Sequence, residues 1–336
     1  MRPTLRSTSS FAALAFMAFL LGGCATGSYD SAQFHSRLDE IAARAKAEGV
    51  SPATIGTHLQ AAQYLPRVIE LDRNQPEFKL DFDTYRDRVI SNTRVQTGVQ
   101  RFQVNKTALK KIERQTGVPG EIVTALWGIE TNFGQITGGF NVVDALATLA
   151  YDGRRSAYFE GELIQALKLI DKNPTLPTPL MGSWAGAMGQ FQFMPSSYNN
   201  FAINADSDKV ADLWRSEADG LASAANYLQK SGWQAGLRYG DAVQLPPGEI
   251  SPELIGIETQ KTVAQWQKLG LRSISGHPLP AGNTKASLLV MDDAGTAFLV
   301  YANYRCILKW NRSHNFALTV GLLSDRIKTG SKTPQS

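Results

Sequence analysis

EIVTALWGIETNFG, residues 121–134, predicts a largely apolar helix that carries one acidic side chain on its apolar side. At about 100° per residue, Glu130 falls within the arc that Ile122 and Leu126 define. Glu121 falls on the opposite side, where a solvated glutamate is expected. The segment therefore predicts a buried helix whose apolar face includes a carboxylate.

A carboxylate in apolar surroundings is costly to ionise, so the pKa of Glu130 is expected to rise. A raised pKa keeps a proton available near neutral pH, which suits a general acid. A buried glutamate paired with an arginine or a backbone amide explains the same pattern. Periodicity alone leaves both interpretations open.

The N-terminus has the pattern of an export signal. Two arginines in MRPTLR precede the apolar run FAALAFMAFLL (11–21), which is too short to span a bilayer that needs about 20 residues. LGGC, ending at Cys24, resembles the lipobox of bacterial lipoproteins, which implies a signal peptide over 1–23 and a lipidated tether over 24–31. Ala25 follows where an aspartate would favour inner-membrane retention, so an outer-membrane protein facing the periplasm is expected. An ordinary cleaved signal with an incidental cysteine is the alternative.

Composition narrows the class further. The chain has 336 residues, of which 43% are hydrophobic and 19% charged, as in ordinary globular proteins. Apart from Cys24 the only cysteine is Cys306, so no internal disulfide is expected. Without Arg2 and Arg6 the net charge falls from +4 to +2, and this weak excess predicts no nucleic-acid partner.

Hydrophobic periodicity divides the mature chain into regions. Helical patterns such as GVQRFQVNKTALKKIERQTG (98–117) fill the first region, and short apolar runs such as TAFLVYANYRCILKW (296–310) favour strands in a later one. The predicted units are a helical subdomain at 32–112, a helical core at 113–236 whose segment 155–170 packs toward that subdomain, a small β-rich subdomain at 237–310, a C-terminal helix at 311–328 and a tail at 329–336.

Four motifs in order carry a family resemblance: ALWGIETNFG (125–134), DALATLAYDGRRSAYFEGEL (144–163), GSWAGAMGQFQFMPSSY (182–198) and LWRSEADGLASAANYL (213–228). Together they resemble the lytic murein transglycosylase B family. The resemblance implies a mainly α (α+β) fold with a lysozyme-like helical catalytic core, an accessory helical subdomain and a small β-rich subdomain.

The resemblance also implies an activity. Members cleave the β-1,4 bond between N-acetylmuramic acid and N-acetylglucosamine in peptidoglycan and leave 1,6-anhydromuramic acid ends. Glu130 matches their single catalytic glutamate, which acts first as acid and then as base, and no catalytic cofactor is needed. A hydrolytic muramidase, which needs a second carboxylate, and a non-catalytic murein-binding lipoprotein are the alternatives. The other acids nearby are expected to be helix caps or surface charges: Asp144, Asp152, Glu160 and Glu162.

Further site residues follow from the same resemblance. Residues expected to line the glycan cleft are Ser183, Gln192, Tyr227, Trp310, Asn311 and Phe316. Arg154 and Arg155 are expected to pair with carboxylates of the peptide stem. Aromatic residues in the core and a solvated helix end are the respective alternatives. Expected partners are glycan strands with their peptide stems and the membrane through the lipid anchor only, with other cell-wall enzymes as candidates.

NADSDKVADLWRSEAD (204–219) has alternating oxygen ligands of the kind that bind a hard cation. Lys209 stands where an EF-hand has its turn glycine, so the match is imperfect. By resemblance the expected ligands of a structural calcium ion are Asn204, Asp206, Asp208, the carbonyl of Val210, and Asp219. A loop capped by its own side chains is the alternative.

Overall fold

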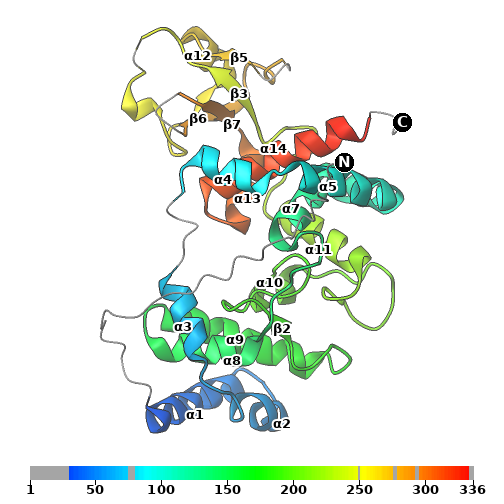
Figure 1. The fold of residues 1–336 in the computed structure, drawn as a ribbon, viewed down its shortest axis with the longest axis vertical. Helices are drawn as coiled ribbons and strands as arrows, with labels where there is room; N and C mark the ends of the chain where they lie inside the picture. Colours follow the sequence, from blue (N-terminus) through cyan, green and yellow to red (C-terminus); the bar gives the residue numbers. More distant parts are fainter. Residues whose placement is uncertain (1–29, 75–79, 249, 275–277, 292–294, 333–336) are drawn as a thin grey trace, which may run out of the picture.

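The structure is a computed structural model that describes residues 30–74, 80–248, 250–274, 278–291 and 295–332. The predicted signal peptide and Cys24 lie outside these residues. The described chain is mostly helical with a small antiparallel sheet (Figure 1), which confirms the predicted fold class.

The principal helices are α1 (Ser31–Ala47), α3 (Pro66–Arg73), α4 (Phe82–Val89), α5 (Asn92–Val104), α6 (Lys106–Thr116), α7 (Gly120–Thr131), α8 (Val142–Asp152), α9 (Ser156–Lys172), α10 (Pro195–Phe201), α11 (Glu217–Lys230), α12 (Val263–Lys268), α13 (Ala302–Trp310) and α14 (His314–Gly330). Short turns of helix are α2 (Pro52–Thr54), η1 (Ile55–Leu59) and η3 (Pro252–Leu254). Strands β1 (Phe140–Asn141) and β2 (Met181–Gly182) form an antiparallel pair.

Helices of the first region divide between two parts of the molecule. α1 and α3 pack on α8 and α9, whereas α4 and α5 pack on α14 (Figure 1). The stripe Phe34, Leu38 and Ile41 on α1 is fully buried, as its spacing requires. Residues 32–112 therefore do not form one separate helical unit, because their apolar faces are covered by different later helices.

One expected helix is two helices in the structure. The segment 98–117 breaks at Asn105, which ends α5 and begins α6. The Asn105 amide donates to the carbonyl of Arg101 (3.2 Å) and to Glu217 (3.0 Å). These bonds hold the junction between α5 and α6 and attach it to the start of α11. Local hydrophobic periodicity cannot predict this contact, because it joins residues far apart in the sequence.

The sheet has the order β4-β6-β7-β3-β5 and covers one end of the molecule (Figure 1). Its strands are β3 (Gly240–Gln244), β4 (Lys261–Thr262), β5 (Arg272–Ser273), β6 (Lys285–Val290) and β7 (Ala297–Val300). β6 and β7 pair with Leu288 opposite Leu299, and Trp266 fills the core beneath them.

The strand prediction for 296–310 is wrong beyond Val300. α13 begins at Ala302, because Asn303, Tyr304 and Ile307 are buried at helical spacing. This helix carries Trp310 away from the sheet and toward the helical core.

α7 is the central helix and packs on α5, α6, α11 and α14. Most of its residues are buried, so Glu130 at its C-terminal end is held in a defined place.

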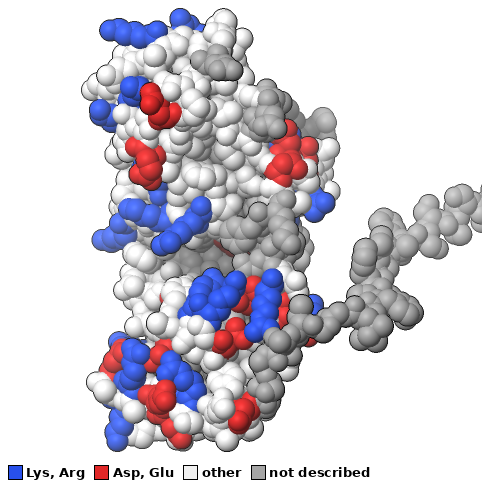
Figure 2. Space-filling view, turned by 90° about the vertical axis from the view of Figure 1, so that its left-hand side faces the viewer, with Lys and Arg blue, Asp and Glu red and all other residues white. Residues whose placement is uncertain are grey.

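On the face drawn in Figure 2, Lys and Arg side chains lie among Asp and Glu side chains. None of the described helices combines the length and apolar character needed to cross a membrane.

Candidate active site

Glu130 lies in the last turn of α7 and is half-buried. Its Oε1 accepts a hydrogen bond of 2.7 Å from the indole Nε1 of Trp310, the last residue of α13. A hydrogen bond donated to a carboxylate favours its charged form. Trp310 is thus a neutral donor to Glu130, a kind of partner that the sequence did not suggest.

The chain leaves α7 through an unusual turn. Asn132 and Phe133 both have positive φ, at 51° and 59°, and Gly134 follows at 81°. The Thr131 hydroxyl donates to the carbonyl of Gln190 (2.6 Å) and accepts from the Gly134 N–H (2.9 Å). The helix end that carries Glu130 is therefore fastened to the glycine-rich loop.

Trp310 is enclosed by other aromatic rings. Its ring meets those of Tyr227 (4.9 Å between centroids) and Phe193 (5.2 Å) edge-on, and Phe201 meets Tyr227 at 4.7 Å. The Tyr227 hydroxyl donates to the carbonyl of Lys309 (2.8 Å). We call Phe193, Phe201, Tyr227 and Trp310 the aromatic cluster. It brings together two predicted cleft residues and links them to Glu130.

The glycine-rich loop 182–193 closes on itself. The Ser183 hydroxyl accepts from the Ala187 N–H (3.1 Å), and the Gln192 amide donates to the carbonyl of Thr137 (3.1 Å). A Cβ on Gly189 would lie 2.5 Å from the Leu213 carbonyl oxygen. Gly189 therefore allows the loop to pack closely against the protein, and Ser183 and Gln192 are half-buried candidates for ligand contact.

The other acids near the motifs all have protein partners. Glu160 is buried between Arg37 (2.6 Å) and Arg44, and Glu162 accepts from the N–H and hydroxyl of Ser196. Asp152 pairs with Arg73 (2.9 Å), and Asp144 accepts from the Gln63 N–H (3.1 Å). Glu160 and Glu162 are buried, whereas the sequence predicted helix caps or surface charges. Partial burial also raises the pKa of Asp144.

Arg154 and Arg155 contact an internal carboxylate. Their guanidinium groups pair with the two oxygens of Asp72 on α3, at 2.7 and 2.5 Å, and Asp72 is only 2% exposed. Arg155 also lies over the Phe159 ring. Both arginines thus neutralise a buried acid that the sequence did not single out, and their expected role toward a peptide stem stays a prediction.

Phe316 does not face a cleft. It lies in the first turn of α14 with 4% of its surface exposed and belongs to the main core, because α14 packs this side on α7. Its ring is not available to a sugar. Asn311 is exposed directly after Trp310, and its Oδ1 accepts from the Ser313 N–H (3.0 Å).

The predicted calcium loop is held by its own hydrogen bonds. The buried Asp219 carboxylate accepts from the N–H groups of Ala205 and Asp212, both at 2.7 Å. Asp208 accepts from Val210, and the Asp206 carboxylate accepts from the Ser216 hydroxyl (2.8 Å). Burial raises the pKa of Asp219.

The oxygen atoms of this loop have the right chemistry for calcium. Among the described residues, however, no group of three His, Cys, Asp or Glu side chains converges as a metal site would require. The contacts match the self-capped alternative, and calcium stays a prediction.

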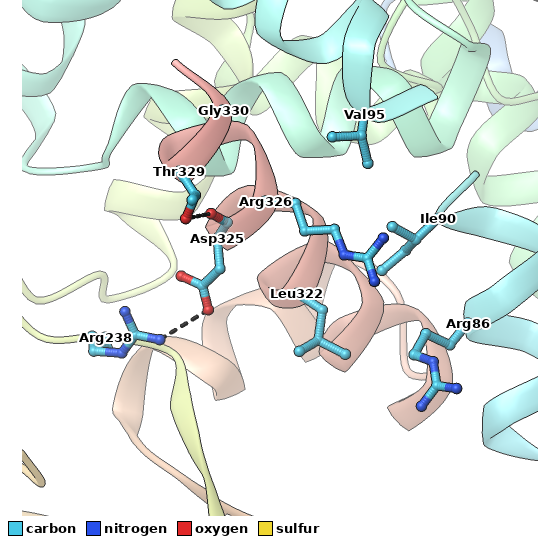
Figure 3. A pocket seen from close by; sticks show the side chains of 9 residues that line it. All are labelled: Arg86, Ile90, Val95, Arg238, Leu322, Asp325, Arg326, Thr329 and Gly330. Atoms are coloured by element: carbon cyan, nitrogen blue, oxygen red, sulfur yellow. Dashed lines mark hydrogen bonds and ion pairs between the residues drawn. The ribbon is translucent and has the colours of Figure 1, made fainter. Parts of the chain in front are cut away.

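A cavity of about 470 Å³ lies elsewhere in the described part of the chain. Its wall includes Arg86, Arg238 and Arg326, and Asp325 accepts from Arg238 across it at 2.9 Å (Figure 3). Neither Glu130 nor the aromatic cluster lines it. This cavity is therefore separate from the candidate site around Glu130.

Sequence reasoning missed three parts of the site. Thr131 has no signal that distinguishes it from an ordinary helix threonine, and Asp72 lies in a segment without a motif. Phe193 stands in the quoted glycine-rich motif, so its aromatic type was visible, but its contact with Trp310 joins positions far apart in the sequence.

A mostly helical molecule with one glutamate held at the end of its central helix has the architecture of the lysozyme-like glycan-cleaving enzymes. The family profile described as "Transglycosylase SLT domain" matches residues 33–325. The chain therefore belongs to the transglycosylase SLT family.

Relatives agree with this membership. The chain is 34% identical over 248 residues to membrane-bound lytic murein transglycosylase B of Escherichia coli strain K12, across 72% of this chain and 66% of that protein. SltB3 from Pseudomonas aeruginosa in complex with NAG-anhNAM-pentapeptide matches with a TM-score of 0.82 and 38% identity, covering 90% of this chain and 81% of that one. Escherichia coli Slt35 in complex with calcium matches with a TM-score of 0.76 and 30% identity, covering 88% and 94%.

Proposed function

We propose that the protein is a lytic transglycosylase that cleaves the β-1,4 bond between N-acetylmuramic acid and N-acetylglucosamine in peptidoglycan and leaves 1,6-anhydromuramic acid ends. The observation that carries the proposal is the half-buried Glu130, held by Trp310 at the end of the central helix. A relative of 38% identity has been crystallised with a NAG-anhNAM peptide, which supports the substrate class.

In the proposed reaction, protonated Glu130 gives its proton to the glycosidic oxygen as the bond to C1 breaks. The resulting carboxylate then takes the proton of the muramic acid O6 hydroxyl as O6 closes on C1. Glu130 ends protonated, so one residue serves as acid and base and no water is consumed. The protein partners of Asp144, Asp152, Glu160 and Glu162 favour this single-carboxylate route over a hydrolytic pair.

Ser183, Gln192, Tyr227, Trp310 and Asn311 are the proposed substrate-binding residues. All are at least partly exposed and lie on the loop, helix and helix end that surround the aromatic cluster. Hydroxyl and amide groups suit the acetamido and hydroxyl groups of the glycan, and flat rings suit the apolar faces of pyranoses.

The proposed location is the outer membrane, with the enzyme lipid-anchored at Cys24 and facing the periplasm, where it would serve murein turnover. The lipobox-like LGGC and the membrane-bound relative support it. Cys24→Ala should move the protein from the membrane fraction to the soluble periplasmic fraction. An unchanged distribution would contradict the anchor.

The activity is tested by mass spectrometry of digested murein. Wild type should release muropeptides that lack one water relative to reducing-end products, and Glu130→Gln should abolish release while murein binding survives. Glu121→Gln, at the other end of α7, is the matched control and should retain activity. Hydrated products would indicate a muramidase, and an unaffected Glu130→Gln variant would indicate a different role for the site.

A further inference from the structure

The aromatic cluster carries more than substrate contact. We infer that Trp310 is a positioning residue for Glu130: its indole N–H fixes one carboxylate oxygen, Oε1, and thereby sets the orientation of the carboxyl group that exchanges the catalytic proton. The inference rests on the proposed function and assigns Trp310 a role through Glu130, separate from stacking on a sugar.

The first step of the argument is the chemistry of the bond. An indole nitrogen donates a hydrogen bond and cannot accept one, unlike a tyrosine hydroxyl. With the Trp310 N–H directed at Oε1 from 2.7 Å, a proton on Oε1 would compete for the same region. The bond therefore disfavours a proton on Oε1. Trp310 cannot itself take up this proton, so Glu130 is the only group of the pair that transfers one.

The second step is the rigidity of the donor. Tyr227 and Phe193 hold the Trp310 ring edge-on from two other segments of the chain. The Tyr227 hydroxyl is fixed to the carbonyl of Lys309, next to Trp310 itself. Rotation of the indole would break these contacts, so the donor is pre-organised before substrate arrives.

The third step concerns the reaction. A hydrogen bond to an ionised carboxylate is shorter and stronger than one to a neutral acid. The Trp310 bond therefore strengthens when Glu130 gives its proton to the leaving oxygen, and it stabilises the state that precedes removal of the O6 proton. Interactions that strengthen during the reaction raise kcat, whereas uniform binding does not.

The test is Trp310→Phe, which keeps an aromatic ring and removes the N–H. We expect kcat to fall about ten- to hundredfold, the effect of losing one hydrogen bond to a charged group, with little change in KM. The alkaline limb of the pH–kcat profile, which reports ionisation of the acid form of Glu130, should move to higher pH, because the carboxylate loses its donor. Trp310→Tyr, whose hydroxyl can donate, should recover part of kcat.

Controls separate this role from others. Trp266→Phe removes a different indole bond, the 3.0 Å bond to the Ala286 carbonyl under the sheet, and should leave kcat unchanged even if stability falls. A Trp310→Phe enzyme with wild-type kcat, an unmoved pH profile and a raised KM would overturn the inference in favour of sugar stacking. If Trp310→Phe does not fold, Trp310→Met, which also removes the N–H, takes its place, and wild-type kcat with an unmoved pH profile in that variant would overturn the inference equally.

Failure of the inference differs from failure of the proposed function. An inactive Glu130→Gln enzyme beside a Trp310→Phe enzyme of normal kcat refutes only the positioning role. An active Glu130→Gln enzyme refutes the proposed function itself, whatever Trp310 does.

Discussion

At the residue scale, Gly128 explains how α7 can end in such a tight turn. The Phe133 ring folds back onto the helix, and a Cβ at position 128 would lie 2.7 Å from that ring. Phe133 also meets Trp127 edge-on. The missing side chain thus makes room for the turn that holds Glu130 in place.

Gly128→Ala should therefore destabilise the protein by about 1–3 kcal/mol, the usual cost of overpacking, and lower kcat by disturbing Glu130. Urea unfolding and murein digestion measure the two effects. Gly161→Ala on α9 is the control, since nothing lies within 4 Å of the added Cβ there, and it should be neutral or stabilising. Equal stability of both variants would contradict the packing argument.

His314 makes stability depend on pH. Burial lowers its pKa below the ordinary value of 6.5, and its Nδ1 lies 2.8 Å from the Tyr304 hydroxyl. Below pH 6.5 the unfolded chain binds this proton more readily than the folded one, so stability is full above 6.5 and falls as the pH drops toward the folded pKa.

His314→Gln should therefore flatten the loss of unfolding free energy between about pH 7 and 5 relative to wild type. Denaturant unfolding at several pH values measures the difference. Parallel pH curves for the two proteins would show that His314 does not contribute.

At the element scale, the 204–219 loop has to accommodate the carboxylates of Asp206, Asp208 and Asp219. The described hydrogen bonds satisfy them one by one, and Slt35 has been crystallised with calcium. We expect saturating calcium to raise Tm by several degrees, because a bound ion stabilises only the folded state.

Asp208→Asn should lose the calcium-dependent shift, whereas Asp39→Asn on α1, an exposed site outside the loop, should keep it. Thermal unfolding with calcium and with chelator makes the comparison. Identical Tm values in wild type would mean that the hydrogen bonds alone close the loop.

At the scale of the whole molecule, Asp72 joins the early helices to the core. It fastens α3 to the turn between α8 and α9 through Arg154 and Arg155. Arg37 and Arg44 of α1 make a similar connection to Glu160 of α9. Ion pairs of buried acids thus connect helices that the sequence places in different regions.

Arg154→Ala should consequently lower stability by about 1–3 kcal/mol, because it removes one hydrogen-bonded cation from a buried acid. The KM of the Arg154→Ala enzyme for stem-bearing glycan should rise no more than its KM for peptide-free glycan. Steady-state kinetics on both substrates decides, with Arg88→Ala on α4 as an exposed control. A selective rise in KM for stem-bearing glycan would support the stem-peptide role.

Much of this architecture follows from local pattern. The helices around 121–133, 142–152 and 314–330 could be predicted, because helical periodicity and end signals are properties of neighbouring residues. The break at Asn105 and the change from strand to helix after Val300 could not, since short apolar runs fit either structure and tertiary contacts select one.

Glu130 illustrates the same division at the site. Helical periodicity and the surrounding motifs singled it out from the sequence, because both depend on spacing along one helix. Its partner Trp310 lies 180 residues away, and the bond between them requires α13 to meet the end of α7. The core position of Phe316 and the ion pairs of Arg154 and Arg155 with Asp72 could not be predicted for the same reason: the burial of Asp72 and the packing of α14 on α7 are set by segments distant in the chain.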